Sequence, residues 1–78
     1  MPVIEITLTV DARGLSCPMP IVKTAQAIKP MSGGQVLEVL ATDPGAVKDF
    51  AAWSKSTGNP IIESGEDAGV YRFLIVRK

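Results

Sequence analysis

The chain contains a single cysteine, Cys17, and no histidine. One thiol cannot close an internal disulfide, and a chain without histidine has neither a Cys/His zinc cluster nor a Cys-His hydrolytic dyad. We therefore expect no metal site. The chemistry that remains is that of one sulfur atom, which acts as a nucleophile in its thiolate form.

Two prolines follow this cysteine in the sequence GLSCPMP, where a helix is predicted to begin. If Cys17 is the N-cap, Pro18 and Pro20 occupy the first and third helical positions, where a missing N–H costs little. Both rings fix φ and stiffen the backbone that holds the sulfur. The Met19 amide is then the main donor to the thiolate, and Arg13 is the nearest cation by sequence. With the positive end of the helix, these groups predict a Cys17 pKa below its ordinary value.

Two residues of this segment admit a second interpretation. Cys17 could be a small buried hydrophobe, since free cysteine is among the most buried residue types. Met19 could fill a gap in the core or be an exposed apolar contact for a partner, because methionine adapts to both settings. From spacing and helix charge alone, the reactive and structural interpretations of Cys17 are equally supported.

The first half of the chain predicts a strand and a helix. Residues 4–10 alternate apolar and polar side chains, which is typical of a strand with one buried face. A polar turn over residues 11–16 follows, and a helix is predicted over residues 18–29, ending at Pro30. The side chains at helical spacing on its predicted inner face are Ile21, Ala25 and Ile28.

The second half predicts a strand, a helix and a hairpin. Residues 35–42 are apolar on nearly every position except Glu38, as in a central strand. In the next helix Asp43 is the predicted N-cap, Pro44 the first helical residue and Gly58 the C-terminal stop. Strands over residues 59–64 and 70–78 are joined by a polar turn. The predicted inner face of the second helix is Val47, Phe50, Ala51 and Ser54, with Trp53 at its edge.

This βαβαββ order predicts a single α/β domain over residues 1–78. Because βαβ crossovers are right-handed, both helices are expected on one face of a four-stranded mixed sheet, which gives a two-layer sandwich. The other face of the sheet is open and is a candidate partner surface. With only four aromatic residues, the core is expected to be largely aliphatic.

The charge distribution and the lack of long apolar runs limit the classes of partner that the chain is expected to bind. Eight basic and eight acidic residues are scattered singly, so no positive field attracts nucleic acid or anionic lipid. The first ten residues lack the basic flank and continuous apolar run of a signal peptide, and there is no 18-residue apolar span. We expect a monomeric cytoplasmic protein that binds neither nucleic acid nor membranes.

The segment DARGLSCPMPIVKTAQAI resembles the signature of the TusA-like (SirA-like) sulfur-carrier family, in which Asp-x-x-Gly-Leu-x-Cys-Pro-x-Pro opens the first helix. The later segment ATDPGAVKDFAAW is similar to the family's second-helix entry at Asp43, Pro44 and Asp49. The resemblance covers essentially the whole chain. It implies that Cys17 carries sulfur as a transient persulfide, with no other cofactor. The donor would be a cysteine desulfurase or a rhodanese-like protein, and a second protein would accept the sulfur.

A sulfur relay requires that partner proteins reach Cys17, which makes its neighbours candidate site residues. Pro18, Met19 and Pro20 are expected to position the thiol. The candidate partner contacts are Arg13, Gly14, Leu15, Met19, Asp43 and Asp49. Asp43 has a simpler interpretation as a helix cap and Asp49 as a solvated helix residue.

The resemblance leaves the pathway open. Ser16 precedes the cysteine, where some family members with a role in tRNA thiolation carry a basic residue, and other members are described only as regulators. A rival hypothesis is a small regulatory or interaction module whose cysteine is structural or redox-sensitive. An RNA-binding module would rest on fold analogy alone, and the neutral charge disfavours it.

Overall fold

The computed structural model describes residues 5–78 and confirms the predicted βαβαββ order. Ile4, the first residue of the predicted first strand, lies outside this range. The elements are β1 (Ile6–Ala12), α1 (Met19–Ile28), β2 (Val36–Ala41), α2 (Ala46–Thr57), β3 (Ile61–Asp67) and β4 (Val70–Val76). No helix in the described residues is long and apolar enough to cross a membrane.

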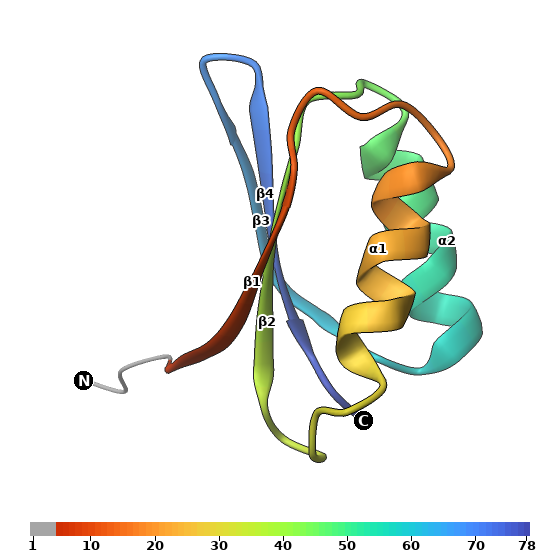
Figure 1. The fold of residues 1–78 in the computed structure, drawn as a ribbon, viewed down its shortest axis with the longest axis vertical. Coiled ribbons are helices and arrows are strands. Elements are labelled where there is room, and N and C mark those ends of the chain that lie inside the picture. Colours follow the sequence, from red (N-terminus) through yellow and green to blue (C-terminus); the bar gives the residue numbers. More distant parts are fainter. Residues whose placement is uncertain (1–4) are drawn as a thin grey trace.

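The four strands form one mixed sheet in the order β1-β2-β4-β3. β1 and β2 are parallel, whereas β4 is antiparallel to both β2 and β3. α1 and α2 lie side by side on the same face of this sheet, and within residues 5–78 no helix lies on the other face (Figure 1). The predicted two-layer α/β sandwich is therefore confirmed.

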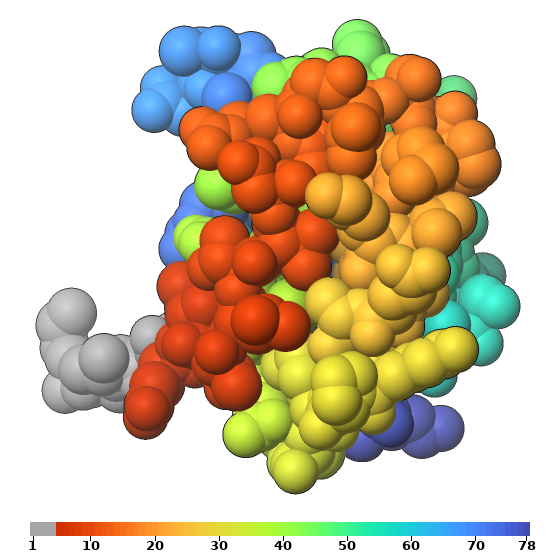
Figure 2. Space-filling view, viewed as in Figure 1, coloured from red at the N-terminus to blue at the C-terminus, as the bar shows by residue number. Residues whose placement is uncertain are grey.

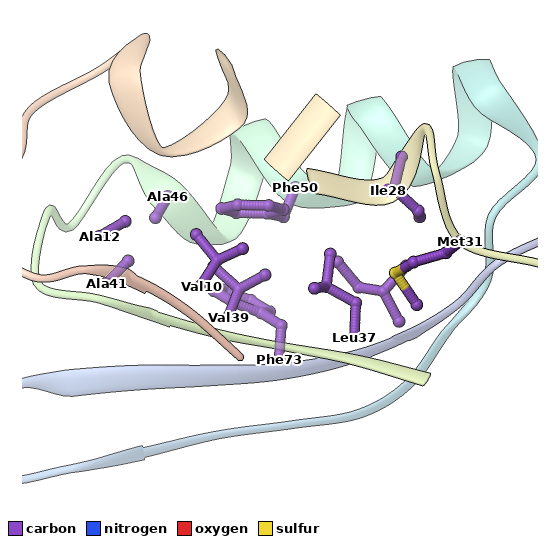
Figure 3. Packing of buried hydrophobic residues seen from close by; sticks show 11 residues of the cluster. Val10, Ala12, Ile28, Met31, Leu37, Val39, Ala41, Ala46, Phe50 and Phe73 are labelled. Carbon is purple, nitrogen blue, oxygen red and sulfur yellow. The ribbon is translucent and has the colours of Figure 1, made fainter. Parts of the chain in front are cut away.

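The core lies between the sheet and the two helices (Figure 3). The rings of Phe50 on α2 and Phe73 on β4 stack with their centroids 4.8 Å apart, and both side chains are buried. Trp53 meets Phe50 edge-on at 6.2 Å and is half-buried. Around this aromatic pair the core is aliphatic, with Met31 closing one end. The other buried members are Val10, Ala12, Ile28, Leu37, Val39, Ala41, Ala46 and Ile75.

The first strand ends two residues later than predicted and is buried only in its second half. It continues to Ala12, so Val10 and Ala12 are buried, whereas Ile6 and Leu8 are exposed. β1 is an edge strand, and its first half curves away from the helical layer (Figure 1). The alternation identified the strand correctly, but helices do not cover the N-terminal part of its apolar face.

The first helix buries a different stripe from the one predicted. Ile28 is buried, but Ile21 and Ala25 are only half-buried. Pro20 and Thr24 are the other buried residues, and the Thr24 hydroxyl donates to the Pro20 carbonyl at 2.8 Å. This bond satisfies the hydroxyl inside the helix, so a polar residue can occupy the inner face.

The second helix begins two residues later than Pro44, with Gly45 as its N-cap. Asp43 instead belongs to a turn, in which its carbonyl accepts the Ala46 N–H at 2.9 Å. The predicted N-cap role of Asp43 and the first-turn position of Pro44 are therefore wrong. Gly58 ends the helix in the left-handed conformation, with φ 79°, as predicted.

The buried face of α2 is rotated about the helix axis relative to the predicted inner face. Ala46 and Phe50 are buried, Ser54 is half-buried, and Val47 and Ala51 are exposed. Ala46 and Phe50 are separated by one helical turn, so they share a face, and Val47 is turned away from it. The prediction was correct for Phe50 and wrong for Val47 and Ala51.

Two substitutions on α2 test this packing. Phe50→Ala should lower the free energy of unfolding by about 3–5 kcal/mol, because it removes a buried ring and leaves a cavity against Phe73. Val47→Ala, an apolar truncation in the same helix, should change it by no more than about 0.5 kcal/mol because Val47 is exposed. Urea denaturation followed by circular dichroism measures both. Similar losses for the two variants would contradict the observed orientation of α2.

Candidate functional site

Cys17 lies in the loop that joins β1 to α1 and is exposed to solvent. This loop and the first turn of α1 form the orange surface at one end of the molecule in Figure 2. Gly14 adopts φ 79° in the loop, a conformation that favours glycine. The structure thus favours an accessible thiol over the alternative of a buried structural cysteine.

Hydrogen bonds fasten the Cys17 loop to the loop between β2 and α2. The Gly14 N–H donates to the Thr42 hydroxyl at 2.9 Å, and the Cys17 N–H donates to Asp43 Oδ2 at 2.9 Å. Asp43 Oδ1 also accepts the Gly45 N–H at 3.3 Å. Two short loops from distant parts of the sequence are therefore hydrogen-bonded to each other through the backbone of the Cys17 loop. The contribution of Thr42 has no signal in the sequence, because its partner lies 28 residues away.

Cys17 is not the N-cap of α1, contrary to the prediction. The helix begins at Met19, and Pro18 is the N-cap with no side-chain capping bond. The Met19 N–H donates to the Ser16 carbonyl at 2.9 Å, so it is engaged by the backbone and does not serve the thiolate. Pro20 is buried in the first turn, and the Cys17–Pro18 peptide bond is cis. The turn at Ser16 to Met19 places the sulfur before the helix and outside the capping position.

The Arg13 side chain turns toward Asp11 rather than toward the thiol. Its Nε and one terminal nitrogen donate to the two carboxylate oxygens at 2.8 and 2.9 Å, and its backbone N–H donates to Oδ1 at 3.1 Å. These bonds lower the pKa of Asp11 to about 2. The pair is exposed, so Arg13 remains a predicted partner contact, but its charge is already balanced within the loop.

The pKa of the Cys17 thiol is raised, and the predicted lowering is wrong. The largest cause is a hydrogen bond with the Asp49 carboxylate, followed by desolvation and by the negative charges of Asp49 and Asp43. A nearby carboxylate disfavours a second negative charge on the sulfur. The prediction counted the helix end and Arg13, whereas the fold brings two acidic side chains from the second loop and α2.

Met19 is exposed to 43% and Val22 to 37%, and the two lie one turn apart on α1. Of the two interpretations of Met19, the structure supports the exposed apolar contact. Gly14 is exposed, whereas Leu15 is half-buried and packs against the core. Asp43 and Asp49 are half-buried beside the thiol. Val22, which the sequence analysis did not single out, extends the apolar surface that begins at Met19.

The site offers one nucleophile and acidic neighbours. Across residues 5–78, no three side chains among Asp, Glu, Cys and His gather where they could hold a metal ion. The arrangement can therefore form and break a bond at a single exposed sulfur, with a second molecule supplying the other reacting atom.

Alkylation across a pH series tests the electrostatics of the thiol. The midpoint of the Cys17 reaction should lie above the ordinary thiol pKa, and Asp49→Asn should lower it because the variant removes the dominant negative neighbour. Asp67→Asn, which makes the same charge change at the end of β3, should leave it unchanged. Because the fold favours the protonated thiol, the stability it contributes is present below the unfolded pKa and is lost as pH rises through the folded pKa. A midpoint below the ordinary value would contradict the assignment.

Comparison with known proteins identifies the family. Residues 8–77 match the family described as sulfurtransferase TusA. The sulfur carrier protein TusA of Allochromatium vinosum is 55% identical over 65 residues, which cover 83% of this chain and 86% of the relative. The protein of the same name from Pseudomonas putida is 34% identical over 68 residues, covering 87% of this chain and 85% of the relative.

A solved structure agrees with this assignment. The crystal structure of a SirA-like protein from Desulfitobacterium hafniense superposes with a TM-score of 0.79 and 26% sequence identity, over 90% of this chain and 96% of that one. The match over residues 8–77 and the identity with these relatives show that the chain belongs to the TusA sulfurtransferase family.

Proposed function

We propose that this protein is a sulfur carrier that accepts a sulfur atom on Cys17 from one protein and passes it to another. The observation that carries the proposal is the exposed single thiol in a Cys-Pro-x-Pro segment, beside an apolar surface formed by Met19 and Val22. The names of the relatives, which describe sulfur carriers, support the same role.

The chemistry requires only one sulfur on this chain. In the loading step the Cys17 thiolate attacks the outer sulfur of a donor persulfide, so a new S–S bond forms on Cys17 and the donor S–S bond breaks. The electron pair of the broken bond leaves with the donor's inner sulfur as a thiolate, and the proton lost by Cys17 passes to that thiolate or to water. In the unloading step an acceptor thiolate attacks the outer sulfur in the same way. No external oxidant or reductant is consumed.

The raised pKa of Cys17 places a requirement on the partner. At neutral pH the free thiol is mostly protonated, so the proton must leave as the donor engages the sulfur. We infer that a cysteine desulfurase or a rhodanese-like protein supplies the persulfide and the groups that accept this proton. The protein acts as a monomer in the reducing cytoplasm, where a free thiol persists.

Intact-mass spectrometry tests the carrier role. Incubation with a cysteine desulfurase and cysteine should add the mass of one sulfur atom to the wild-type chain, and a reductant should remove it. Cys17→Ser should stay unmodified because it has no thiol. If the serine variant gains the same mass, Cys17 is not the carrier residue. The wild type could also gain no mass with a cysteine desulfurase or with a rhodanese-like donor. If blocking the thiol then leaves the binding of partner proteins intact, the regulatory-module hypothesis is favoured instead.

A charge placed on the apolar surface tests docking. Met19→Glu should slow single-turnover sulfur transfer about fivefold or more, because docking would bury an unpaired charge in an apolar contact. Ile62→Glu is the matched control, since Ile62 is exposed to 47% on β3, away from the Cys17 loop. Both variants should melt within a few degrees of the wild type, because both side chains are exposed. Equal transfer by the two variants would move the docking surface elsewhere.

A further inference from the structure

We infer that Asp43 is a positioning residue for sulfur transfer: its carboxylate holds the main chain of Cys17 and thereby fixes where the sulfur is presented to a partner. This inference rests on the proposed function. It assigns Asp43 an internal role, which differs from the contact with partner proteins that the family resemblance implied.

The geometry carries the inference. Asp43 Oδ2 accepts the Cys17 N–H at 2.9 Å, so the carboxylate bonds the residue that bears the sulfur. The same side chain is held in place by the Gly45 N–H on Oδ1, and the Asp43 carbonyl accepts the Ala46 N–H. Asp43 follows β2 by two residues, and β2 pairs with strands on both sides. The tether therefore starts from the end of a central strand of the sheet.

The Cys17 loop has few other restraints close to the sulfur. Pro18 and Pro20 have no N–H to donate, and the Met19 N–H returns to Ser16 within the same turn. Gly14 is bonded to Thr42, but it lies three residues before the sulfur. The Asp43 bond is thus the tether between the Cys17 backbone and the rest of the fold, and bonds of an ionised carboxylate to N–H are stronger than neutral ones.

The two acidic neighbours of Cys17 have separable roles. Asp49 acts on the sulfur itself, since its carboxylate is the largest cause of the raised thiol pKa. Asp43 contributes a weaker charge effect and bonds the backbone. Loss of Asp49 should therefore change the pH at which the thiol ionises. Loss of Asp43 should instead change the rate at which the ionised thiol reacts with a sulfur bound to another protein. Small misplacements of reacting atoms cost large factors in rate.

Three variants separate position from charge: Asp43→Ala, Asp43→Asn and Asp49→Asn. Asparagine keeps one acceptor oxygen, so it can retain the bond to the Cys17 N–H by giving up the longer bond to Gly45. Alanine retains neither bond. The readout is single-turnover sulfur transfer from a persulfidated cysteine desulfurase across a pH series. At high pH the thiol is fully ionised in every variant, so the limiting transfer rates there can be compared directly.

We expect Asp43→Ala to lower this limiting rate by at least tenfold, and Asp43→Asn to restore most of it. Asp49→Asn should shift the pH midpoint of transfer downward, because it removes the carboxylate that most raises the thiol pKa. An unchanged limit in Asp43→Ala would overturn the inference. Equal losses in Asp43→Ala and Asp43→Asn would also overturn it, because they would show that the negative charge matters and the acceptor does not.

A measurement on the unloaded protein keeps the inference testable if Asp43→Ala does not fold. In the wild type, the Cys17 amide should be protected from exchange with deuterium, because its N–H donates to Asp43 Oδ2 at 2.9 Å. Asp43→Asn should retain most of this protection, because asparagine keeps an acceptor oxygen. A wild-type Cys17 amide that exchanges as fast as that of an unstructured peptide would overturn the tether. If the wild type gains no sulfur by intact mass, the carrier role fails, and the exchange of this amide still reports whether Asp43 holds Cys17.

Discussion

The parallel pairing of β1 with β2 is the constraint on which the site depends. Its register places Ala12 opposite Ala41, the last residues of the two strands. Because parallel strands run in the same direction, the loops that follow them leave the sheet at the same end (Figure 1). One of these loops carries Cys17 and the other carries Thr42 and Asp43, so the crossover through α1 brings together residues 26 positions apart.

The same arrangement explains why the Cys17 thiol is exposed and yet has a raised pKa, so that it is mostly protonated at neutral pH. A cysteine at a helix cap would be expected to ionise easily, but here the sulfur stands before the helix and faces carboxylates from the β2–α2 loop and from α2. Oxidation and alkylation follow thiolate content, so this environment slows both while the thiol is free. Exposure and low intrinsic reactivity are both compatible with the proposed sulfur carrier, in which the second reacting sulfur belongs to another protein.

The fold followed from the sequence because its signals are local. Alternating apolar residues predicted β1, Gly58 predicted the end of α2, and the order of elements limited the topology to a sandwich. Both helix starts were predicted wrongly, because competing turns decide these boundaries. Ser16 and Asp43 each accept a backbone N–H in a turn that delays the helix, and neither choice is visible from residue type alone.

The chemistry of the site was predictable in kind but not in detail. The lone cysteine before a predicted helix made Cys17 the candidate nucleophile, and the structure shows that Cys17 and Met19 are both exposed. Its electrostatics depend on which charges the fold brings near the sulfur, and sequence distance misjudged them. Arg13, four residues away, pairs with Asp11, whereas Asp49, more than thirty residues away, is the largest cause of the raised thiol pKa. A charge argument based on sequence distance assumes that the nearest charged residue is unpaired. Arg13 does not meet this condition, because it forms an ion pair with the Asp11 carboxylate.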